Sequence, residues 1–284
     1  MLPIESLNLL TLNVGKAQHD GDWNWKNVSS PFTRIFLVAQ GKAQLCLPGR
    51  TILLLPGHMY LVPAHMVHSY CCDGPLTLYY LHIYQSFKNE ADIFEYYDFP
   101  CEVKSSDRDA LLLDAMIARH PEAKLPQSDP RSYDNQCQFT TWVQRYSQWA
   151  LHDKMWMRGC LLMLFSRFLE AATQKPWTHD ERMMGIVDHI QSHLCDDISV
   201  DTLSSLCCIS KPYLIRIFKK HLGVSPLHYI NQKRVERAQL LLMTSEMTVK
   251  QIAYSLGYND HGYFIRLFRK FTGTTPMEYK RSVS

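Results

Sequence analysis

Two stretches of the sequence align with each other without a gap: LIRIFKKHLGVSPLHY at residues 214–229 and FIRLFRKFTGTTPMEY at residues 264–279. They begin 50 residues apart. Both contain an apolar residue, Ile, Arg, a second apolar residue, Phe and two basic residues, followed by Gly, Ser or Thr, Pro and Tyr. Sixteen aligned positions indicate an internal repeat of one structural unit.

Each copy is predicted to be a short helix, a tight turn and a second helix, which is the arrangement of a helix-turn-helix module. The first helices are expected over residues 200–207 and 249–256. Ser199 and Thr248 precede them as N-caps, since a side-chain oxygen there accepts a hydrogen bond from the first turn. The second helices are expected between capping residues, Ser210 and Gly223 in the first copy and Asp260 and Gly273 in the second.

One face of each second helix is apolar and the other is basic. The apolar residues recur at helical spacing and predict a buried stripe: Leu214, Ile217 and Phe218, then Phe264, Leu267 and Phe268. A single basic helix is usually only a solvated surface, whereas two copies with Arg in the same register favour DNA binding. A joining helix over residues 227–243 would let both basic helices enter successive major grooves, about 34 Å apart.

The charge of the chain is distributed unevenly. Residues 183–284 hold 13 Lys or Arg and 8 Asp or Glu, a balance of +5, whereas residues 1–182 hold 17 and 19, a balance of −2. This asymmetry favours a polyanionic partner for the C-terminal part. The sequence has no secretory or transit pattern at its start and no apolar run of about 18 residues, so we expect a cytoplasmic protein with no membrane partner and with reduced thiols.

The N-terminal and central parts differ in periodicity. Short apolar runs broken by Gly and Pro over residues 32–84 predict strands of a small barrel or sandwich. Helices are expected over residues 109–120 and 139–172, with a loop over residues 121–135 between them. The aromatic and Met content of the second region indicates a core or a subunit interface, so we expect a homodimer. A linker is expected over residues 174–181.

The C-terminal repeat is similar to the DNA-binding domain of the AraC/XylS family of transcription regulators. The resemblance covers residues 183–280: residues 252–279 resemble the second helix-turn-helix of the family, and residues 203–229 are similar to the first. It implies seven helices, with residues 183–195 as a leading support helix. It also implies which residues read bases: Lys211, Pro212, Ile215 and Arg216 in the first copy, and His261, Gly262, Ile265 and Arg266 in the second. Gly262 departs from the Ser that is usual there, so readout by the second copy would rest on His261 and Arg266.

The remaining basic residues of the two helices are expected to meet DNA phosphates, which position the protein without specifying sequence. They are Lys219, Lys220, Arg269 and Lys270. Arg216 and Arg266 are the best candidates for bidentate contacts to guanine.

Residues 56–70 resemble the second motif of cupins, with Gly57, Pro63 and His68 on its recurrent positions. The first metal motif of catalytic cupins is absent around residues 32–41, and a lone His68 cannot hold a metal ion with three ligands. We therefore expect a barrel that binds a small molecule and has no catalytic residues, metal or cofactor. The pocket candidates are Arg34, His68, Tyr70 and His82, with Trp23 and Trp25 in an N-terminal arm as a lid. Each of these residues could equally be a core or rim residue with local partners.

The prediction is thus an α+β chain with three parts: a cupin-like barrel (residues 1–100), a helical dimerisation or linker segment (101–174) and an all-α domain with two helix-turn-helix units (183–284). The predicted function is transcription regulation through double-stranded promoter DNA in response to a small molecule such as a sugar, with RNA polymerase as a further partner. Two alternatives stay open: a cupin-type enzyme with an appended DNA-binding domain, and a regulator that needs no ligand.

Overall fold

The computed structural model describes residues 7–85, 92–133 and 136–282. By its internal contacts the chain divides into two compact units. Of the described residues, the β-rich unit comprises 8–85, 97–133 and 136–173, and the helical unit comprises residue 7 and residues 92–96 and 174–282. No helix in the described part of the chain is long and apolar enough to cross a membrane.

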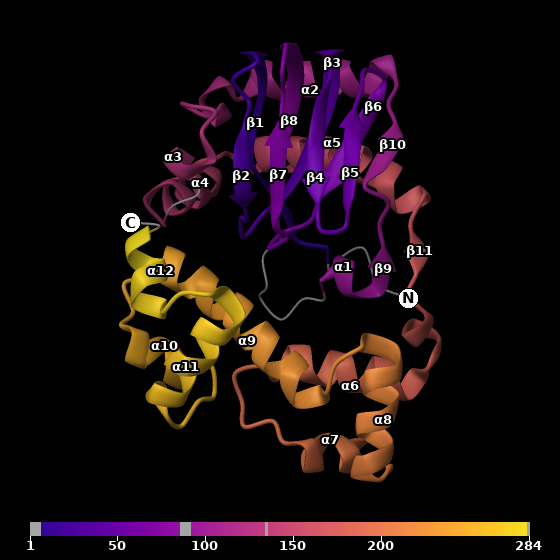
Figure 1. Cartoon of the computed structure of the whole chain (residues 1–284), viewed down its shortest axis with the longest axis vertical. Helices are drawn as coiled ribbons and strands as arrows, with labels where there is room; N and C mark the ends of the chain where they lie inside the picture. The colour runs from indigo at the N-terminus through magenta and orange to yellow at the C-terminus, as the bar shows by residue number, and fades with distance from the viewer. Residues whose placement is uncertain (1–6, 86–91, 134–135, 283–284) are drawn as a thin grey trace. The chain divides into compact units, whose positions relative to one another are not determined.

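The β-rich unit is built on two antiparallel sheets that face each other (Figure 1). The five-stranded sheet has the order β1 (Leu9–Asp20), β8 (Pro75–Gln85), β3 (Thr33–Gly41), β6 (His58–Val62) and β10 (Glu102–Lys104). The four-stranded sheet has the order β2 (Trp25–Val28), β7 (His68–Cys71), β4 (Ala43–Leu47) and β5 (Arg50–Leu54). Apolar side chains of both sheets, including Phe36, Leu45 and Leu78, form the core between them.

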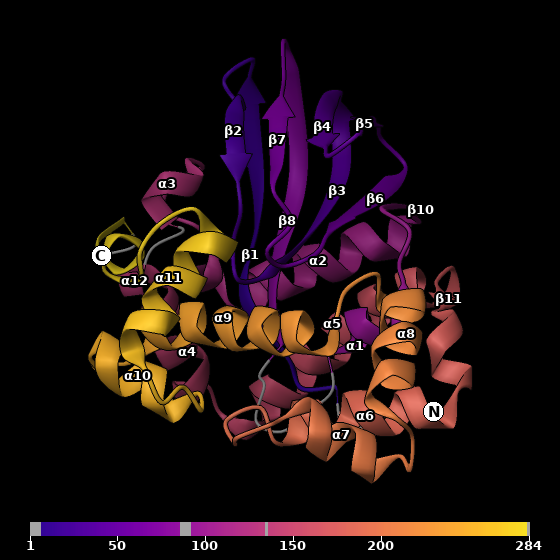
Figure 2. The same ribbon diagram turned by 60° about the horizontal axis from the view of Figure 1, so that its bottom comes forward.

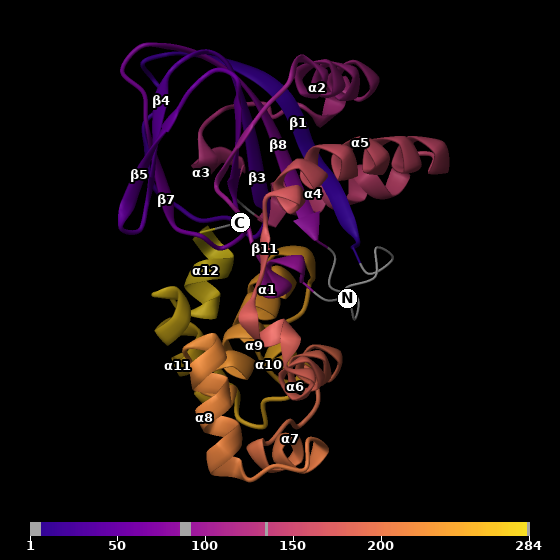
Figure 3. The same cartoon turned by 90° about the vertical axis from the view of Figure 1, so that its right-hand side faces the viewer.

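Three helices pack on the five-stranded sheet through contacts with β1. They are α2 (Asp107–Arg119), α4 (Gln136–Gln148) and α5 (Leu151–Glu170), and Figure 3 shows them on the face away from the four-stranded sheet. Between α2 and α4 the chain forms the 3-10 turn η2 (Pro121–Ala123) and α3 (Pro130–Tyr133). A two-stranded ladder pairs β9 (Tyr97–Asp98) with β11 (Thr173–Gln174), where the chain passes between the units.

The helical unit contains both copies of the repeat on one long helix (Figure 2). Its elements are α1 (Ile93–Tyr96), the 3-10 helix η3 (Pro176–His179), α6 (Glu181–Ser192), α7 (Val200–Leu206), α8 (Lys211–Leu222), α9 (Pro226–Thr244), α10 (Val249–Ser255), α11 (His261–Thr272) and α12 (Pro276–Ser282). Helices α7 and α8 form the first helix-turn-helix, α10 and α11 form the second, and α9 joins them.

The predicted capping residues bound these helices, although the side chain of Ser210 makes no capping hydrogen bond to α8. The side chains of Ser199 and Thr248 accept hydrogen bonds from the backbone of the first turns of α7 and α10. Gly223 and Gly273 end α8 and α11 with φ of +73° and +81°, a left-handed conformation that glycine adopts without a steric penalty.

The α+β fold class with two helix-turn-helix units is confirmed, but several local predictions were wrong. The strands begin at residue 9, so β1 and β2 were missed because their polar residues obscure the apolar alternation. The region expected as a loop at residues 121–135 contains η2 and α3. The expected linker is folded: Trp177 of η3 is buried in the helical unit, where its ring lies 5.3 Å from that of Tyr96.

Candidate nucleic-acid interface and ligand cavity

The two recognition helices, α8 and α11, bury their apolar stripes and expose their basic residues. Leu214, Ile217 and Phe218 are buried in the first copy and Phe264 and Phe268 in the second. Most of the predicted DNA-contacting side chains are exposed: Lys211, Pro212, Arg216, Lys219, Lys220, His261, Arg266, Arg269 and Lys270. Ile215, Gly262 and Ile265 are half-buried at the edge of the same faces. The fold therefore presents each predicted contact on its recognition helix.

An aromatic ring holds Arg216 of α8, and the sequence analysis missed this contact. The guanidinium of Arg216 lies 5.0 Å from the centre of the Tyr213 ring, and that of Arg182 at the start of α6 lies 5.7 Å from it. A cation over an aromatic face is attracted by the negative charge of the ring. The spacing of Tyr213 and Arg216, three residues apart in a helix, was the available signal.

A carboxylate lies beside Arg266 of α11. Oδ1 of Asp260 accepts a 2.7 Å hydrogen bond from the backbone N–H of Gly262, and Oδ2 lies 3.9 Å from Arg266. The hydrogen bonds from the backbone of Gly262 and Tyr263 lower the pKa of Asp260. A Cβ at position 262 would lie 3.1 Å from Oδ1 of Asp260 and 3.7 Å from the Arg266 guanidinium. Gly262 therefore leaves room for this pair.

Arg234 on α9 links the segment that precedes the first helix-turn-helix to the turn of the second. Its buried guanidinium donates hydrogen bonds to the carbonyls of Leu194 (2.9 Å) and Asp196 (2.5 Å), just after α6, and lies 5.2 Å from the ring of Tyr258 in the second unit. Gly257, in the turn between α10 and α11, has φ of +77°. A Cβ there would lie 2.8 Å from Arg234 and 2.9 Å from the Asp196 carbonyl.

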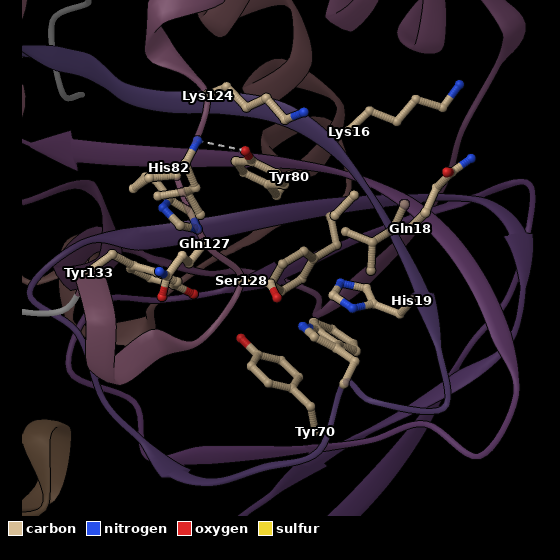
Figure 4. Close-up of a pocket in the computed structure, with 16 residues that line it drawn as sticks. Lys16, Gln18, His19, Tyr70, Tyr80, His82, Lys124, Gln127, Ser128 and Tyr133 are labelled. Carbon is tan, nitrogen blue, oxygen red and sulfur yellow. Dashed lines mark hydrogen bonds between the residues drawn. The ribbon is translucent and has the colours of Figure 1, made fainter.

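The β-rich unit contains a cavity of about 360 Å³ between its sheets and the segment that follows η2. Its lining comes from β1, β3, β7, β8 and residues 124–133. The lining residues are Lys16, Ala17, Gln18, His19, Trp23, Phe36, Tyr70, Leu78, Tyr80, His82, Lys124, Leu125, Pro126, Gln127, Ser128 and Tyr133. Figure 4 shows these side chains around the cavity.

Aromatic rings form one wall of the cavity. Trp23 stacks on Tyr70 with ring centroids 4.1 Å apart and on His19 at 5.8 Å, and Phe36 meets Trp23 edge-on at 5.6 Å. Only 5% of Trp23 is exposed. Such a wall can pack against an apolar face of a ligand.

His68 fixes the direction of the Tyr70 hydroxyl. Burial lowers the pKa of His68 to about 4, with the charge of Arg34 as a second cause, so the ring is neutral at pH 7. Nδ1 lies 2.7 Å from the carbonyl of Met66, which can only accept, so Nδ1 carries the proton. Nε2 therefore accepts the 2.6 Å hydrogen bond from Tyr70, which leaves Tyr70 facing the cavity as an acceptor.

Tyr80 and His82 supply further neutral polar groups. The Tyr80 hydroxyl accepts a 2.8 Å hydrogen bond from the backbone N–H of Leu125, so its own hydrogen points elsewhere. Burial raises the pKa of Tyr80 to about 12, and burial together with the charge of Arg34 lowers the pKa of His82 well below its usual value. Among the residues that the structure describes, Nδ1 of His82 has no hydrogen-bond partner, although only 1% of the residue is exposed.

Of the six predicted pocket residues, Trp23, Tyr70 and His82 line the cavity. Arg34 and His68 are buried outside its lining: Arg34 donates a 2.6 Å hydrogen bond to Ser30 and lies over the ring of Phe32. Trp25 lies on β2, and Trp23 packs in the core, so neither belongs to an N-terminal arm. The lining residues of β1 and of residues 124–128 were missed, because no ligand-binding motif marks them.

The remaining chemistry-bearing side chains are dispersed. Within residues 7–85, 92–133 and 136–282, no three His, Cys, Asp or Glu side chains are grouped so that they could hold a metal ion. The eight cysteines whose side chains are described are free thiols, including the neighbours Cys71, which is exposed, and Cys72, which is buried.

Comparison with known proteins gives one match for each unit. Residues 14–123 match the AraC-like ligand binding domain, and residues 203–282 match a helix-turn-helix domain. Among curated relatives, the regulatory protein PocR of Salmonella typhimurium is 30% identical over 112 residues, which cover 39% of this chain and 37% of PocR. The transcriptional activator RhaS of Salmonella arizonae is 26% identical over 115 residues, which cover 40% of each chain. The chain thus spans about two-fifths of the length of these relatives.

A solved structure shares the whole fold. The crystal structure of unsaturated fatty acid bound ToxT from Vibrio cholerae is 17% identical, with a TM-score of 0.51, and the match covers 97% of this chain and 96% of that one. The family matches in both units and this fold agree with the resemblance seen in the C-terminal repeat. The chain belongs to the AraC family, and it combines an AraC-like ligand-binding domain with a helix-turn-helix domain.

Proposed function

We propose that this chain is a transcription regulator that binds promoter DNA through α8 and α11 and responds to a small molecule held in the cavity of the β-rich unit. The observation that carries the proposal is the pair of basic recognition helices on one connecting helix. With 19 residues, α9 is about 28 Å long, which is of the same order as the major-groove repeat of about 34 Å. Arg234 on α9 contacts both the segment before α7 and Tyr258 in the turn before α11. These contacts support a fixed arrangement of the two helix-turn-helix modules.

In this proposal, Arg216 and Arg266 contact guanine edges, and His261 and Lys211 contact further bases. Pro212, Ile215, Gly262 and Ile265 allow close approach or apolar contact, for instance with a thymine methyl. Lys219, Lys220, Arg269 and Lys270, which lie on the exposed faces, meet phosphates.

The test is selection of duplexes from a random library by the full-length chain at a stated salt concentration, since affinity for DNA depends steeply on salt. Two sequence blocks about one helical turn apart would support the proposal. Recovery of unrelated duplexes only would mean that the basic faces act through charge alone, and the proposal would fail.

The buried polar groups of the cavity are neutral and favour an uncharged polar effector such as a sugar, whereas the two lysines of the lining, Lys16 and Lys124, are exposed. Tyr80 has a hydrogen to donate, and the buried Nδ1 of His82 has no partner among the described residues. The aromatic wall formed by Trp23, Tyr70 and Phe36 can pack against the C–H groups of a ring. A buried polar atom without a partner is destabilising, so a ligand that satisfies His82 would gain affinity.

This effector class can be tested by thermal shift with a panel of neutral sugars and polyols, carboxylated sugars and unsaturated fatty acids. A ligand at 100 times its Kd stabilises the folded state by about 2.7 kcal/mol. We expect the neutral compounds to raise the melting temperature and His82→Phe to abolish the shift. Stabilisation by the fatty acids alone would contradict this class, and no shift with any compound would favour a regulator that needs no ligand.

The proposal includes a homodimer formed through the β-rich unit. Trp142, Trp149 and Phe165 are core residues, but Leu151, Met155 and Met163 on α5 are exposed, Met155 by 67%. Exposed large apolar side chains along one helix are typical of subunit interfaces. Sedimentation at micromolar concentration should show a dimer, and Met155→Glu with Met163→Glu should give a monomer. A wild-type monomer with and without DNA would contradict it.

An effect on transcription requires RNA polymerase, and contact with the polymerase stays a prediction, as does a cytoplasmic location. The curated relatives PocR and RhaS are named as regulators, which supports a non-enzymatic role. The alternative of a cupin-type enzyme is tested by metal analysis of the purified protein. Stoichiometric iron, zinc or manganese would favour the enzyme.

A further inference from the structure

A short segment from the first half of the sequence is folded into the helical unit. Residues 92–96, which we call the acidic strap, consist of Asp92 and helix α1. In the sequence they lie between strands β8 and β9 of the β-rich unit, yet their contacts are with residues 174–284. Ile93 and Tyr96 of the strap are buried.

The first part of the strap is held by α9. The ammonium of Lys233 pairs with Glu95, lies 2.9 Å from Oε2 of Glu236 and lies 4.0 Å from Oδ2 of Asp92. Tyr229, one turn earlier on α9, donates a 2.9 Å hydrogen bond to the other carboxylate oxygen of Glu95. The Lys233 side chain is only 13% exposed. Glu95 is therefore bound by two α9 residues in a largely buried site.

The second part of the strap is held by α6 and the segment before it. The Tyr96 hydroxyl hydrogen-bonds to Asp188 of α6. Lys175 donates to the strap twice, from its backbone N–H to the carbonyl of Tyr96 (2.9 Å) and from its ammonium to the carbonyl of Phe94 (2.8 Å). The strap thus links α6 to α9, the two helices that flank the first helix-turn-helix.

The charges make these contacts interdependent. Burial alone would lower the pKa of Lys233, but the carboxylates of Glu236, Glu95 and Asp92 raise it well above its usual value, so the ammonium stays charged. Removal of one partner from a buried ion pair leaves a charge that neither water nor protein stabilises fully. Loss of Glu95 should therefore disturb α9 as well as the strap.

We propose that the acidic strap is a required part of the DNA-binding unit: it ties α6 to α9, and its release weakens sequence-specific DNA binding by the first helix-turn-helix. The role in DNA binding rests on the function proposed above. In the sequence the strap lies between two strands of the β-rich unit. The backbone therefore connects that unit directly to a segment that binds α9.

The test compares full-length Glu95→Gln, Lys233→Met and the double variant with the wild-type chain. Glu246→Gln, which changes an exposed acid just beyond α9, is the matched control. Hydrogen exchange is measured for peptides covering residues 92–96 and 229–236. We expect each single variant to speed exchange in both peptides at least tenfold, the double variant to add nothing further, and the control to leave exchange unchanged.

Binding is measured with duplexes selected by the wild-type chain and with a random duplex of equal length. We expect a loss of at least fivefold on selected DNA and less than twofold on random DNA. Two results would contradict the proposed link between the strap and α9. One is unchanged exchange at residues 92–96 in the single variants, and the other is a double variant whose effect is the sum of the two single effects. Faster exchange with unchanged DNA affinity would overturn its role in DNA binding. If the wild-type chain selects no duplex, the function proposed above fails. The hydrogen-exchange result still tests whether Glu95 and Lys233 hold the strap on α9.

Discussion

Nε2 of His68 accepts a hydrogen bond from the hydroxyl of Tyr70 at 2.6 Å, which couples a buried neutral imidazole to the wall of the cavity. Burial lowers the pKa of His68 from 6.5 to about 4, so the unfolded chain binds this proton more tightly than the folded chain does. The stability that His68 contributes is therefore present above pH 6.5 and is lost as the pH falls toward 4.

This loss amounts to about 3 kcal/mol when fully developed, at 1.36 kcal/mol per pH unit. Chemical denaturation at pH 7 and pH 4 should show a smaller pH dependence for His68→Gln than for the wild-type chain. His152→Gln, at a histidine whose side chain is 74% exposed, is the control for the substitution itself. Equal pH dependence of His68→Gln and wild type would contradict the neutral, buried imidazole.

Two DNA-binding variants separate base reading from phosphate contact. Arg216→Ala removes a guanidinium held over Tyr213, and we expect a loss of about 1 to 3 kcal/mol on selected DNA with little change on random DNA. Lys219→Ala should weaken binding to both equally and reduce the salt slope by about 1. Fluorescence anisotropy at several salt concentrations measures both quantities. Arg266→Ala is expected to behave as Arg216→Ala does. If either variant loses affinity equally on selected and random DNA, that arginine does not read bases.

Substitutions in the turns of the two helix-turn-helix modules are expected to change stability in opposite directions. Cys208 has φ of +53°, a left-handed conformation that is strained for a residue with a Cβ, so Cys208→Gly should stabilise the helical unit by about 1 kcal/mol. Cys208→Ala keeps the Cβ and should have no such effect. Gly257→Ala should destabilise the unit by about 2 kcal/mol or more, because the new Cβ would overlap Arg234 and two carbonyls. Chemical denaturation followed by helical circular dichroism measures all three, and a destabilised Cys208→Gly would refute the strain.

Gly15 controls the position of Tyr80 in the cavity. A Cβ at position 15 would lie 2.2 Å from the Tyr80 hydroxyl oxygen, so Gly15→Ala must displace the ring and break its hydrogen bond with Leu125. We expect a lower melting temperature, by a cost of about 1 to 3 kcal/mol, and loss of the stabilisation by any effector found in the thermal-shift panel. Gly74→Ala, at a position with open space, is the control. A full effector response in Gly15→Ala would show that Tyr80 does not contact the ligand.

The helical unit was predictable from sequence because its signals are local. Caps such as Thr248, C-terminal glycines such as Gly273 and the apolar stripe around Phe264 all lie within one or two turns of the elements that they define. Because the unit is repeated, most of these local patterns occur twice in the sequence. Helix boundaries differed from the predicted ones by only a few residues, as for α9.

The cavity and the acidic strap depend on contacts between distant residues. Strand register and the position of the second sheet determine whether a residue on a strand faces the cavity. The sequence therefore suggested Tyr70, His82 and Arg34 alike, but only Tyr70 and His82 line the cavity. The strap is one turn long and has no periodicity. Its partner Lys233 is 138 residues away from Glu95 in the sequence, and no local pattern links them.

The position of the strap also bears on how such chains can be recombined. A helical unit that includes residues 92–96 as well as residues 174–284 is not one continuous stretch of the sequence. A gene fusion joined at a single point near residue 174 would transfer both helix-turn-helix modules but leave Glu95 behind with the donor's barrel. Lys233 would then meet a foreign segment in the chimera. Functional transfer of the helical unit of this chain would therefore require two junctions, or a host that places an acid opposite Lys233.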